Sequence, residues 1–211
     1  MHNRPMHWII SLYQYSREGH RMKLHYGGRF QTKEDFKSHR EHQEGAVAFR
    51  EPSQTVFAIV ANAGCIVVLI MLCMIIYSIG GQSFREFASK IGISAIISMI
   101  ALIPHELLHA MCFKEDVYLY YDPSKFMVFV HGTESMSKQR FVFMSLLPNV
   151  MFGMIPFVLF ILNHNWVLLG MIGALCISAG FGDYINVFNA LTQMPKGAKT
   201  YLYDFQSYWY T

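Results

Sequence analysis

Charged residues are scarce in this sequence. Only 15% of its 211 residues are Asp, Glu, Lys or Arg, whereas 53% are hydrophobic. Soluble domains carry about 25% charged and about 45–50% apolar residues, so the composition argues against a soluble protein. The scarcity is greatest in four segments that each approach the ~20 residues needed to cross a bilayer: 56–79, 91–113, 141–162 and 166–190. Because these segments are continuously apolar rather than alternating, they predict an all-α integral membrane protein with four transmembrane helices.

Cysteine is also rare, and it never occurs at a spacing that binds metal. The four cysteines form no CxxC pair, which argues against a cysteine-based zinc site, and we expect them to be reduced packing residues. The first long apolar run follows a polar stretch of about fifty residues, so we expect no signal peptide. The sequence also lacks nucleic-acid motifs, and no nucleic-acid partner is expected.

The predicted spans divide the chain into three parts. Residues 1–54 are expected to be a cytoplasmic N-terminal tail that lies on the membrane or is partly disordered. Residues 55–190 form the four-helix domain, and residues 191–211 form a cytoplasmic tail whose Tyr and Trp side chains suit the headgroup level. Of the 17 Lys and Arg residues, 9 precede the first helix, 4 lie between the second and third, and 2 follow the fourth, against 2 in the loop 80–90. The positive-inside rule therefore places both termini in the cytoplasm.

Four ionisable side chains fall inside the predicted spans: His105, Glu106, His109 and Asp183. Each costs about 2.5–3.5 kcal/mol at membrane depth, so we expect them to meet one another, a metal or water. His105 and His109 are one helical turn apart, so their imidazoles can reach one ion, with Glu106 beside them. This is the H-E-x-x-H arrangement of zinc hydrolases. The alternative is a polar cluster at a helix end that only packs.

Asp183 is the expected third metal ligand, because catalytic zinc usually has three protein ligands and one open position. His105 and His109 lie 14 and 18 residues after Ile91, and Asp183 lies 17 residues after Trp166, so all three share a depth. Close packing of the second and fourth spans is predicted by a ridge of small residues in the fourth: Gly170, Ala174, Ser178 and Gly182. In the alternative, the ridge packs on the third span and Asp183 only bonds to backbone.

The run HELLHA, residues 105–110, and the later "GFGDYINV" give the chain a family resemblance. It resembles the putative zincin peptidases of bacterial membranes and, more distantly, the site-2 proteases. The resemblance implies that His105, His109 and Asp183 bind zinc and that Glu106 is the catalytic base. In addition, "LLPNV" resembles the G-P-x-x-N element of site-2 proteases, which implies a substrate contact for Asn149, with plain packing as the alternative.

The segment 117–132, which follows the metal motif, predicts a cytoplasmic β-hairpin. It has two β-rich runs around the turn residues Asp122-Pro123-Ser124. A peptide substrate could add a strand to this hairpin, or the hairpin could simply cover the helix ends. We expect its His131, and His39 and His42 of the N-terminal segment, to be solvated side chains rather than ligands.

Together these features predict a zinc-dependent metallopeptidase that acts within or next to the membrane. Its expected partners are the lipid bilayer and a membrane protein or peptide substrate, and its expected location is the bacterial cell membrane, crossed several times. The alternative is a metal-binding membrane protein without catalysis: a transporter, a sensor or a protease-derived scaffold. The first and third spans carry no charge, which argues against a transporter because transport needs polar steps along the whole path.

Overall fold

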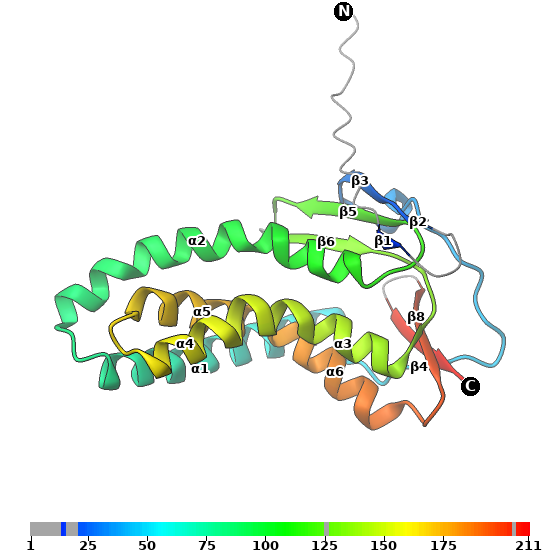
Figure 1. Cartoon of the computed structure of the whole chain (residues 1–211). Coiled ribbons are helices and arrows are strands. Elements are labelled where there is room, and N and C mark those ends of the chain that lie inside the picture. Colours follow the sequence, from blue (N-terminus) through cyan, green and yellow to red (C-terminus); the bar gives the residue numbers. More distant parts are fainter. Residues whose placement is uncertain (1–13, 16–20, 125–126, 204–205) are drawn as a thin grey trace, which may run out of the picture.

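The computed structural model describes residues 14–15, 21–124, 127–203 and 206–211. Its helices lie side by side in an elongated bundle, and its sheets gather toward one end (Figure 1). Within the described residues, three helical segments are long and apolar enough to cross a membrane, or four if the bent pair 167–179 and 181–193 is one span. The prediction of several helices that could span a membrane is confirmed by their length and composition. The prediction of an all-α fold holds only in part, because the described residues also form three small sheets.

The first three helices each begin at a serine cap. They are α1, α2 and α3, spanning Gln54–Ile79, Phe84–Met111 and Lys138–Pro148. The hydroxyls of Ser53, Ser83 and Ser137 each accept a backbone N–H from the first turn. At α2 the Glu86 side chain also bonds back to the Ser83 N–H, which completes a capping box. This cap explains why α2 begins before the expected residue 91, in a turn too polar to be read from hydropathy.

The third span is one continuous helical segment that contains a π-helical turn, whereas the fourth is broken. The third continues from α3 through the π-helical turn η2 (Asn149–Met154) into α4 (Ile155–Leu162). The fourth is split into α5 (Val167–Ala179) and α6 (Phe181–Gln193), which are bent by 49°.

Small residues of α5 allow α4 to pack closely against it. A Cβ added at Gly170 would lie 2.6 Å from the Phe160 ring, and one at Gly173 would lie 2.6 Å from the Phe157 backbone nitrogen. The prediction that the small-residue ridge packs on the second span is therefore wrong at Gly170, where the alternative contact with the third span is found.

Two small sheets pack at the end of the bundle that carries the α2 C-terminus (Figure 1). The first has the order β3-β5-β6, and the second has the order β4-β9-β8-β7. In the first sheet β3 is parallel to β5, and β6 is antiparallel to it. The bounds are β3 Leu24–Arg29, β5 Val117–Asp122, β6 Met127–His131, β4 Val47–Ala48, β9 Gln206–Tyr210, β8 Lys199–Tyr203 and β7 Met136–Ser137, with a separate ribbon of β1 Gln14–Tyr15 and β2 Arg21–Met22.

The hairpin predicted over 117–132 is confirmed as β5 and β6. The two expected tails, in contrast, are built into the sheets: the N-terminal segment supplies β3 and β4, and the C-terminal segment forms the β8–β9 hairpin. These strands were not predicted because β4 has two residues, and β3 has a register shift between Tyr26 and Gly28 that breaks the alternating pattern.

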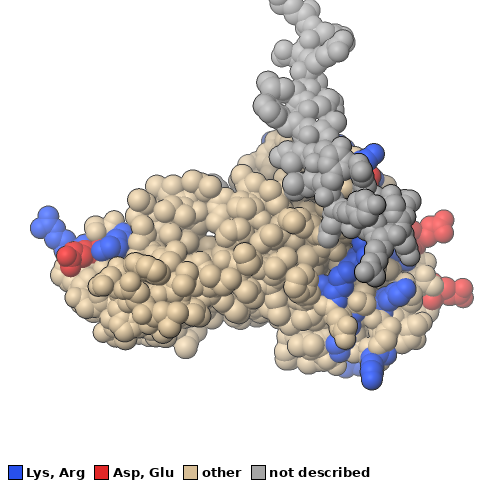
Figure 2. Space-filling view, viewed as in Figure 1, with Lys and Arg blue, Asp and Glu red and all other residues tan. Residues whose placement is uncertain are grey.

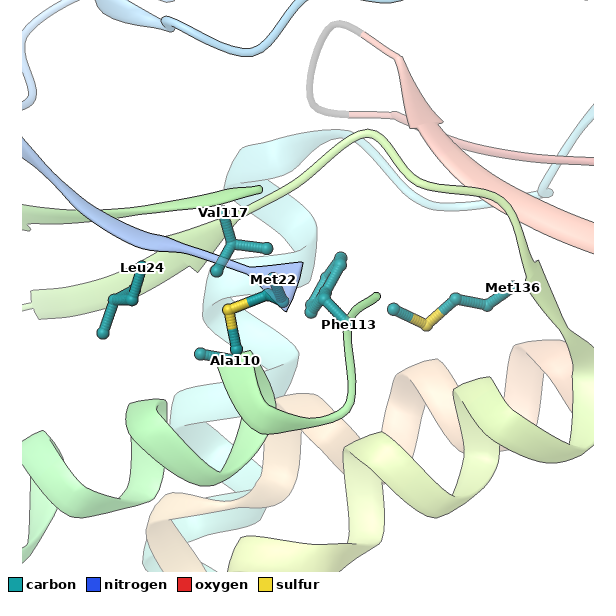
Figure 3. Close-up of a cluster of buried hydrophobic side chains, with 6 residues drawn as sticks. All are labelled: Met22, Leu24, Ala110, Phe113, Val117 and Met136. Atoms are coloured by element: carbon teal, nitrogen blue, oxygen red, sulfur yellow. The ribbon is translucent and has the colours of Figure 1, made fainter. Parts of the chain in front are cut away.

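A cluster of buried side chains joins the end of α2 to both sheets (Figure 3). Burying each large apolar side chain contributes about 1.5–3 kcal/mol. Ala110 and Phe113 come from the last turn of α2 and the residues after it, so the cluster fixes the position of that turn. Its members are Met22, Leu24, Ala110, Phe113, Val117 and Met136.

The helices expose an apolar surface between two charged ends. Figure 2 shows Lys, Arg, Asp and Glu gathered at the α1–α2 turn and around the sheets, with a band between them that lacks these residues on the face shown. Many large apolar side chains on α1 and α2 are exposed, and four of them, Ile59, Ile66, Ile96 and Ile100, are 57–65% exposed. Such a large exposed apolar surface is typical of a membrane-facing helix.

His131 of β6 is buried rather than solvated, so that prediction is wrong. Its side chain is 2% exposed, and its ring stacks on Phe36 with centroids 3.7 Å apart. Within the described part of the chain its Nδ1 has no hydrogen-bond partner. Burial, with a smaller contribution from nearby His39, lowers the pKa of His131 from its ordinary value of 6.5 to about 4.

We predict that stability falls as the pH is lowered from about 6.5 towards about 4. The unfolded chain takes up a proton on His131 in this range and the folded chain does not, so protonation favours unfolding, by at most about 3 kcal/mol. The measurement is the thermal midpoint of the wild type and His131→Phe from pH 7 to pH 4. Phe preserves the ring stack without titrating, so the wild type should lose more stability than the variant, and equal losses would contradict the prediction.

Candidate metal centre

Helix α2 brings two imidazoles together. His105 and His109 are one turn apart, and their Nε2 atoms are 3.1 Å from each other. The ring planes are nearly perpendicular, at 77°. The two nitrogens are close enough to bind one ion. The spacing read from the sequence therefore has the predicted geometry.

Asp183 completes the group from the other half of the chain. It lies in the first turn of α6, just after the bend at Gly180. One carboxylate oxygen is 3.4 Å from His105 Nε2, and the other is 3.6 Å from His109 Nε2. The three side chains are only 12–19% exposed. The structure thus brings together the three side chains expected to be metal ligands.

The distances fit a zinc ion. Ligand atoms about 2.0–2.1 Å from a tetrahedral zinc lie about 3.3–3.4 Å from one another, close to the observed 3.1, 3.4 and 3.6 Å. The other nitrogen of His109, Nδ1, lies 2.9 Å from the carbonyl oxygen of Met144. When Nδ1–H donates to that carbonyl, the Nε2 lone pair faces the ion. The three residues therefore fit a zinc ion and leave a fourth coordination position for water.

Asn149 holds the aspartate in place. Its side-chain N–H groups donate to Asp183 Oδ2 at 2.8 Å and to the Ser145 carbonyl at 3.1 Å. Asn149 is fully buried, at 0% exposed. It approaches Gly180 so closely that a Cβ there would lie 1.6 Å from Asn149 Oδ1. The residue predicted to contact substrate therefore stands behind the metal ligand instead of facing a cavity.

Glu106 lies beside the two histidines and is held by the hairpin. Its Oε2 accepts a hydrogen bond from the backbone N–H of Val130 in β6, at 3.0 Å. The other carboxylate oxygen makes no hydrogen bond with any described residue and is available for a water molecule. Thus β6 sets the orientation of the glutamate that the H-E-x-x-H motif places next to the ion.

Two cavities meet at this group. One, of about 240 Å³, lies toward the sheets, and its walls include the polar side chains of Glu134, Ser145, Thr200 and Ser207. The other, of about 350 Å³, lies among the helices, and its walls include the apolar side chains of Phe57, Leu102, Phe152 and Leu175. Three residues line both cavities: Glu106, Asp183 and Asn186. Apolar side chains such as Phe113, Phe141 and Leu202 also line the first cavity. The candidate metal centre therefore lies between a partly polar cavity, called the polar cavity below, and a more apolar one, called the apolar cavity.

Two features of the site were not predicted from the sequence. Asn186 follows Asp183 by three residues on the same helix, so a helical projection of "GDYIN" could have placed both on one face. The bond between Glu106 and Val130 had no sequence signal, because it joins a helix to a strand edge through a backbone N–H that every residue except proline has.

The comparison with known families agrees with this geometry. A family model described as "Putative zincin peptidase" matches residues 97–199, which include Glu106 and the three candidate ligands. The match agrees with the resemblance predicted from the HELLHA motif, and it supports a metallopeptidase. Neither a curated protein nor a solved structure matches the chain.

We predict that Gly180→Ala weakens zinc binding by about 10–100-fold, the range expected when a partner of a metal ligand is displaced. The new methyl group would collide with Asn149 and push it away from Asp183. Zinc affinity is measured by competition with a chelator. Gly182→Ala is the matched control, because a Cβ there meets no atom within 4 Å. Equal zinc affinity in the two variants would show that Asn149 does not support the site.

Proposed function

We propose that this protein is a zinc-dependent metallopeptidase that hydrolyses peptide bonds within or next to the membrane. One observation carries the proposal: a carboxylate on the H-E-x-x-H helix lies beside three candidate zinc ligands at the meeting point of two cavities. The family match agrees with this reaction class. His105, His109 and Asp183 are the proposed ligands, and Glu106 is the proposed general base.

The glutamate is placed to move protons. When bound, zinc supplies a water of lowered pKa and polarises the scissile carbonyl. Glu106 then accepts the proton of the attacking water and returns it to the leaving amine. The hydrogen bond from Val130 to Oε2 keeps the carboxylate in the same orientation throughout, and Asn149 does the same for Asp183. Glu106 and Asp183 thus each accept a hydrogen bond from one amide N–H outside their own helix.

Water and substrate have different routes to the site in this proposal. The polar cavity, with Ser145, Thr200 and Ser207 in its walls, suits water arriving from the side of the sheets. The apolar cavity among the helices suits the hydrophobic part of a membrane protein or membrane-anchored peptide. The scissile bond would lie between them, at Glu106.

The hairpin offers a way to hold an extended substrate. Among the residues that the structure describes, strand β6 pairs only with β5, so it is an edge strand. Because Val130 turns its N–H toward Glu106, Val128 turns its backbone groups the same way. Met127 and Val128 line the apolar cavity beside His105. A substrate strand added along this edge would therefore run past the metal centre, which favours strand addition over plain cover of the helix ends.

The charge distribution supports a multi-pass location with both termini and the sheets in the cytoplasm. Of the 17 Lys and Arg residues, 15 belong to the N-terminal segment, the loop 114–140 or the C-terminal segment, and only Arg85 and Lys90 lie at the α1–α2 turn. The positive-inside rule then orients the bundle with that turn outside. In this orientation the polar cavity faces the cytoplasm, where water is available.

We predict that His109→Ala and Asp183→Asn each reduce zinc affinity more than about 100-fold, because each removes one of three protein ligands. The measurement is metal content of the purified protein after dialysis against a weak chelator. His164→Ala is the control, since His164 lies in the turn between α4 and α5 and lines neither cavity. Full zinc content in Asp183→Asn would show that Asp183 of α6 is not a zinc ligand.

We predict that Glu106→Gln lowers the rate of peptide cleavage at least about 10²–10⁴-fold while zinc content stays unchanged, because the amide cannot accept the proton of the attacking water. Cleavage is followed on reporter peptides fused to a membrane segment, with the protein in detergent or liposomes. Cleavage by the variant at the wild-type rate would exclude Glu106 as the base. Zinc binding without any cleavage by the wild type would favour the alternative of a metal-binding protein without catalysis.

A further inference from the structure

One polar side chain at the meeting point of the two cavities has no assigned role. Glu106 and Asp183 line both cavities and belong to the candidate metal centre. Asn186 also lines both cavities. A group in this position contacts whatever passes from one space to the other.

The Asn186 amide is uncommitted in the described structure. The side chain is half-buried, and it makes no hydrogen bond with any residue that the structure describes. Its amide atoms are not among the enclosed polar atoms without a partner, so they are open to a molecule that occupies the cavities it lines. Asn149 provides the contrast, because it is fully buried and donates to both Asp183 and Ser145. Of the two amides beside Asp183, Asn186 is the one that lines the cavities.

The position of Asn186 along α6 sets what it reaches. It follows Asp183 by three residues, so the two side chains share a face of the helix with Cβ atoms about 5–6 Å apart. A ligand atom near the ion is therefore within reach of the Asn186 side chain. An asparagine offers two N–H donors and one carbonyl acceptor, which match the carbonyl and N–H of a peptide unit.

We propose that Asn186 binds the backbone of the substrate peptide where the chain passes from the apolar cavity to the polar one. Its amide N–H donates to a peptide carbonyl next to the scissile bond, and its carbonyl accepts a peptide N–H. The inference rests on the proposed peptidase function. The inference adds a residue that binds the peptide backbone. Because every peptide has the same backbone groups, Asn186 would bind substrates with different side chains.

The test compares two zinc-binding ligands that differ in whether they have a peptide backbone. One is a hydroxamate attached to a dipeptide, and the other is acetohydroxamate, which has no peptide unit. Their affinities for zinc-loaded protein in detergent are measured by calorimetry in the wild type, Asn186→Ala and Asn186→Leu. Asn189→Ala is the matched control, because Asn189 is one turn further along α6, is bonded by Gln193 and lines neither cavity.

Both Asn186 variants should bind the dipeptide hydroxamate about 10–100-fold more weakly than the wild type, as expected for the loss of one or two hydrogen bonds. Their zinc content and acetohydroxamate affinity should not change, and Asn189→Ala should behave like the wild type. Wild-type affinity for the dipeptide hydroxamate in both Asn186 variants would overturn the proposal. An equal loss for both hydroxamates would also overturn it, because the effect would then act through the metal.

The experiment separates this inference from the proposed function. Zinc content is measured before any ligand is added. A wild-type protein without zinc would contradict both the proposed function and this inference. Hydroxamate binding requires no turnover. A zinc-loaded protein that cleaves no peptide would therefore count against the proposed function, while the two affinities would still decide the role of Asn186.

Discussion

Three ionisable side chains meet inside an otherwise apolar bundle, and the arrangement of the helices depends on that meeting. Each of them alone costs about 2.5–3.5 kcal/mol at membrane depth, so His105, His109 and Asp183 are compatible with these helices only where they compensate one another or share a cation. The break at Gly180 turns α6 so that Asp183 reaches α2, and the absence of a side chain at Gly180 lets Asn149 support that aspartate. The π-helical turn that begins at Asn149 and the bend at Gly180 are thus part of the site.

The sheets are as necessary to the site as the helices. The cluster around Phe113 fixes the last turn of α2, which carries His109, against both sheets. The edge strand β6 orients Glu106 through the Val130 N–H, and side chains of β8 and β9 form walls of the polar cavity. Helices supply the metal ligands because their spacing fits one ion. The strands supply the backbone donors and the enclosed polar space that a hydrolytic reaction needs next to a lipid-facing surface.

The equal depth of Asp183 and the two histidines was predicted from starting points that the structure revises. Helix α2 begins at Phe84 rather than at residue 91, and the fourth span is two helices. The residues nevertheless meet, because α5 packs against α1, α2 and α4 and carries α6 to that level. Their meeting could be expected from the sequence because the cost of burying a charge leaves few places for a lone aspartate. The tails were interpreted wrongly, because β4 has only two residues, β3 has a register shift, and the aromatic side chains of β8 and β9 are equally typical of a membrane interface.

The sequence by itself determined the apolar spans and the convergence of His105 and His109 with Glu106 beside them. Both follow from local rules, since the length of an apolar run and the spacing of 3.6 residues per turn need no knowledge of distant residues. Only the tertiary structure decided that Asp183 joins them, that Val130 bonds Glu106, and that Asn186 lies between two cavities. Those contacts join residues far apart in the chain, and they depend on how helices and strands pack, which a local pattern does not encode.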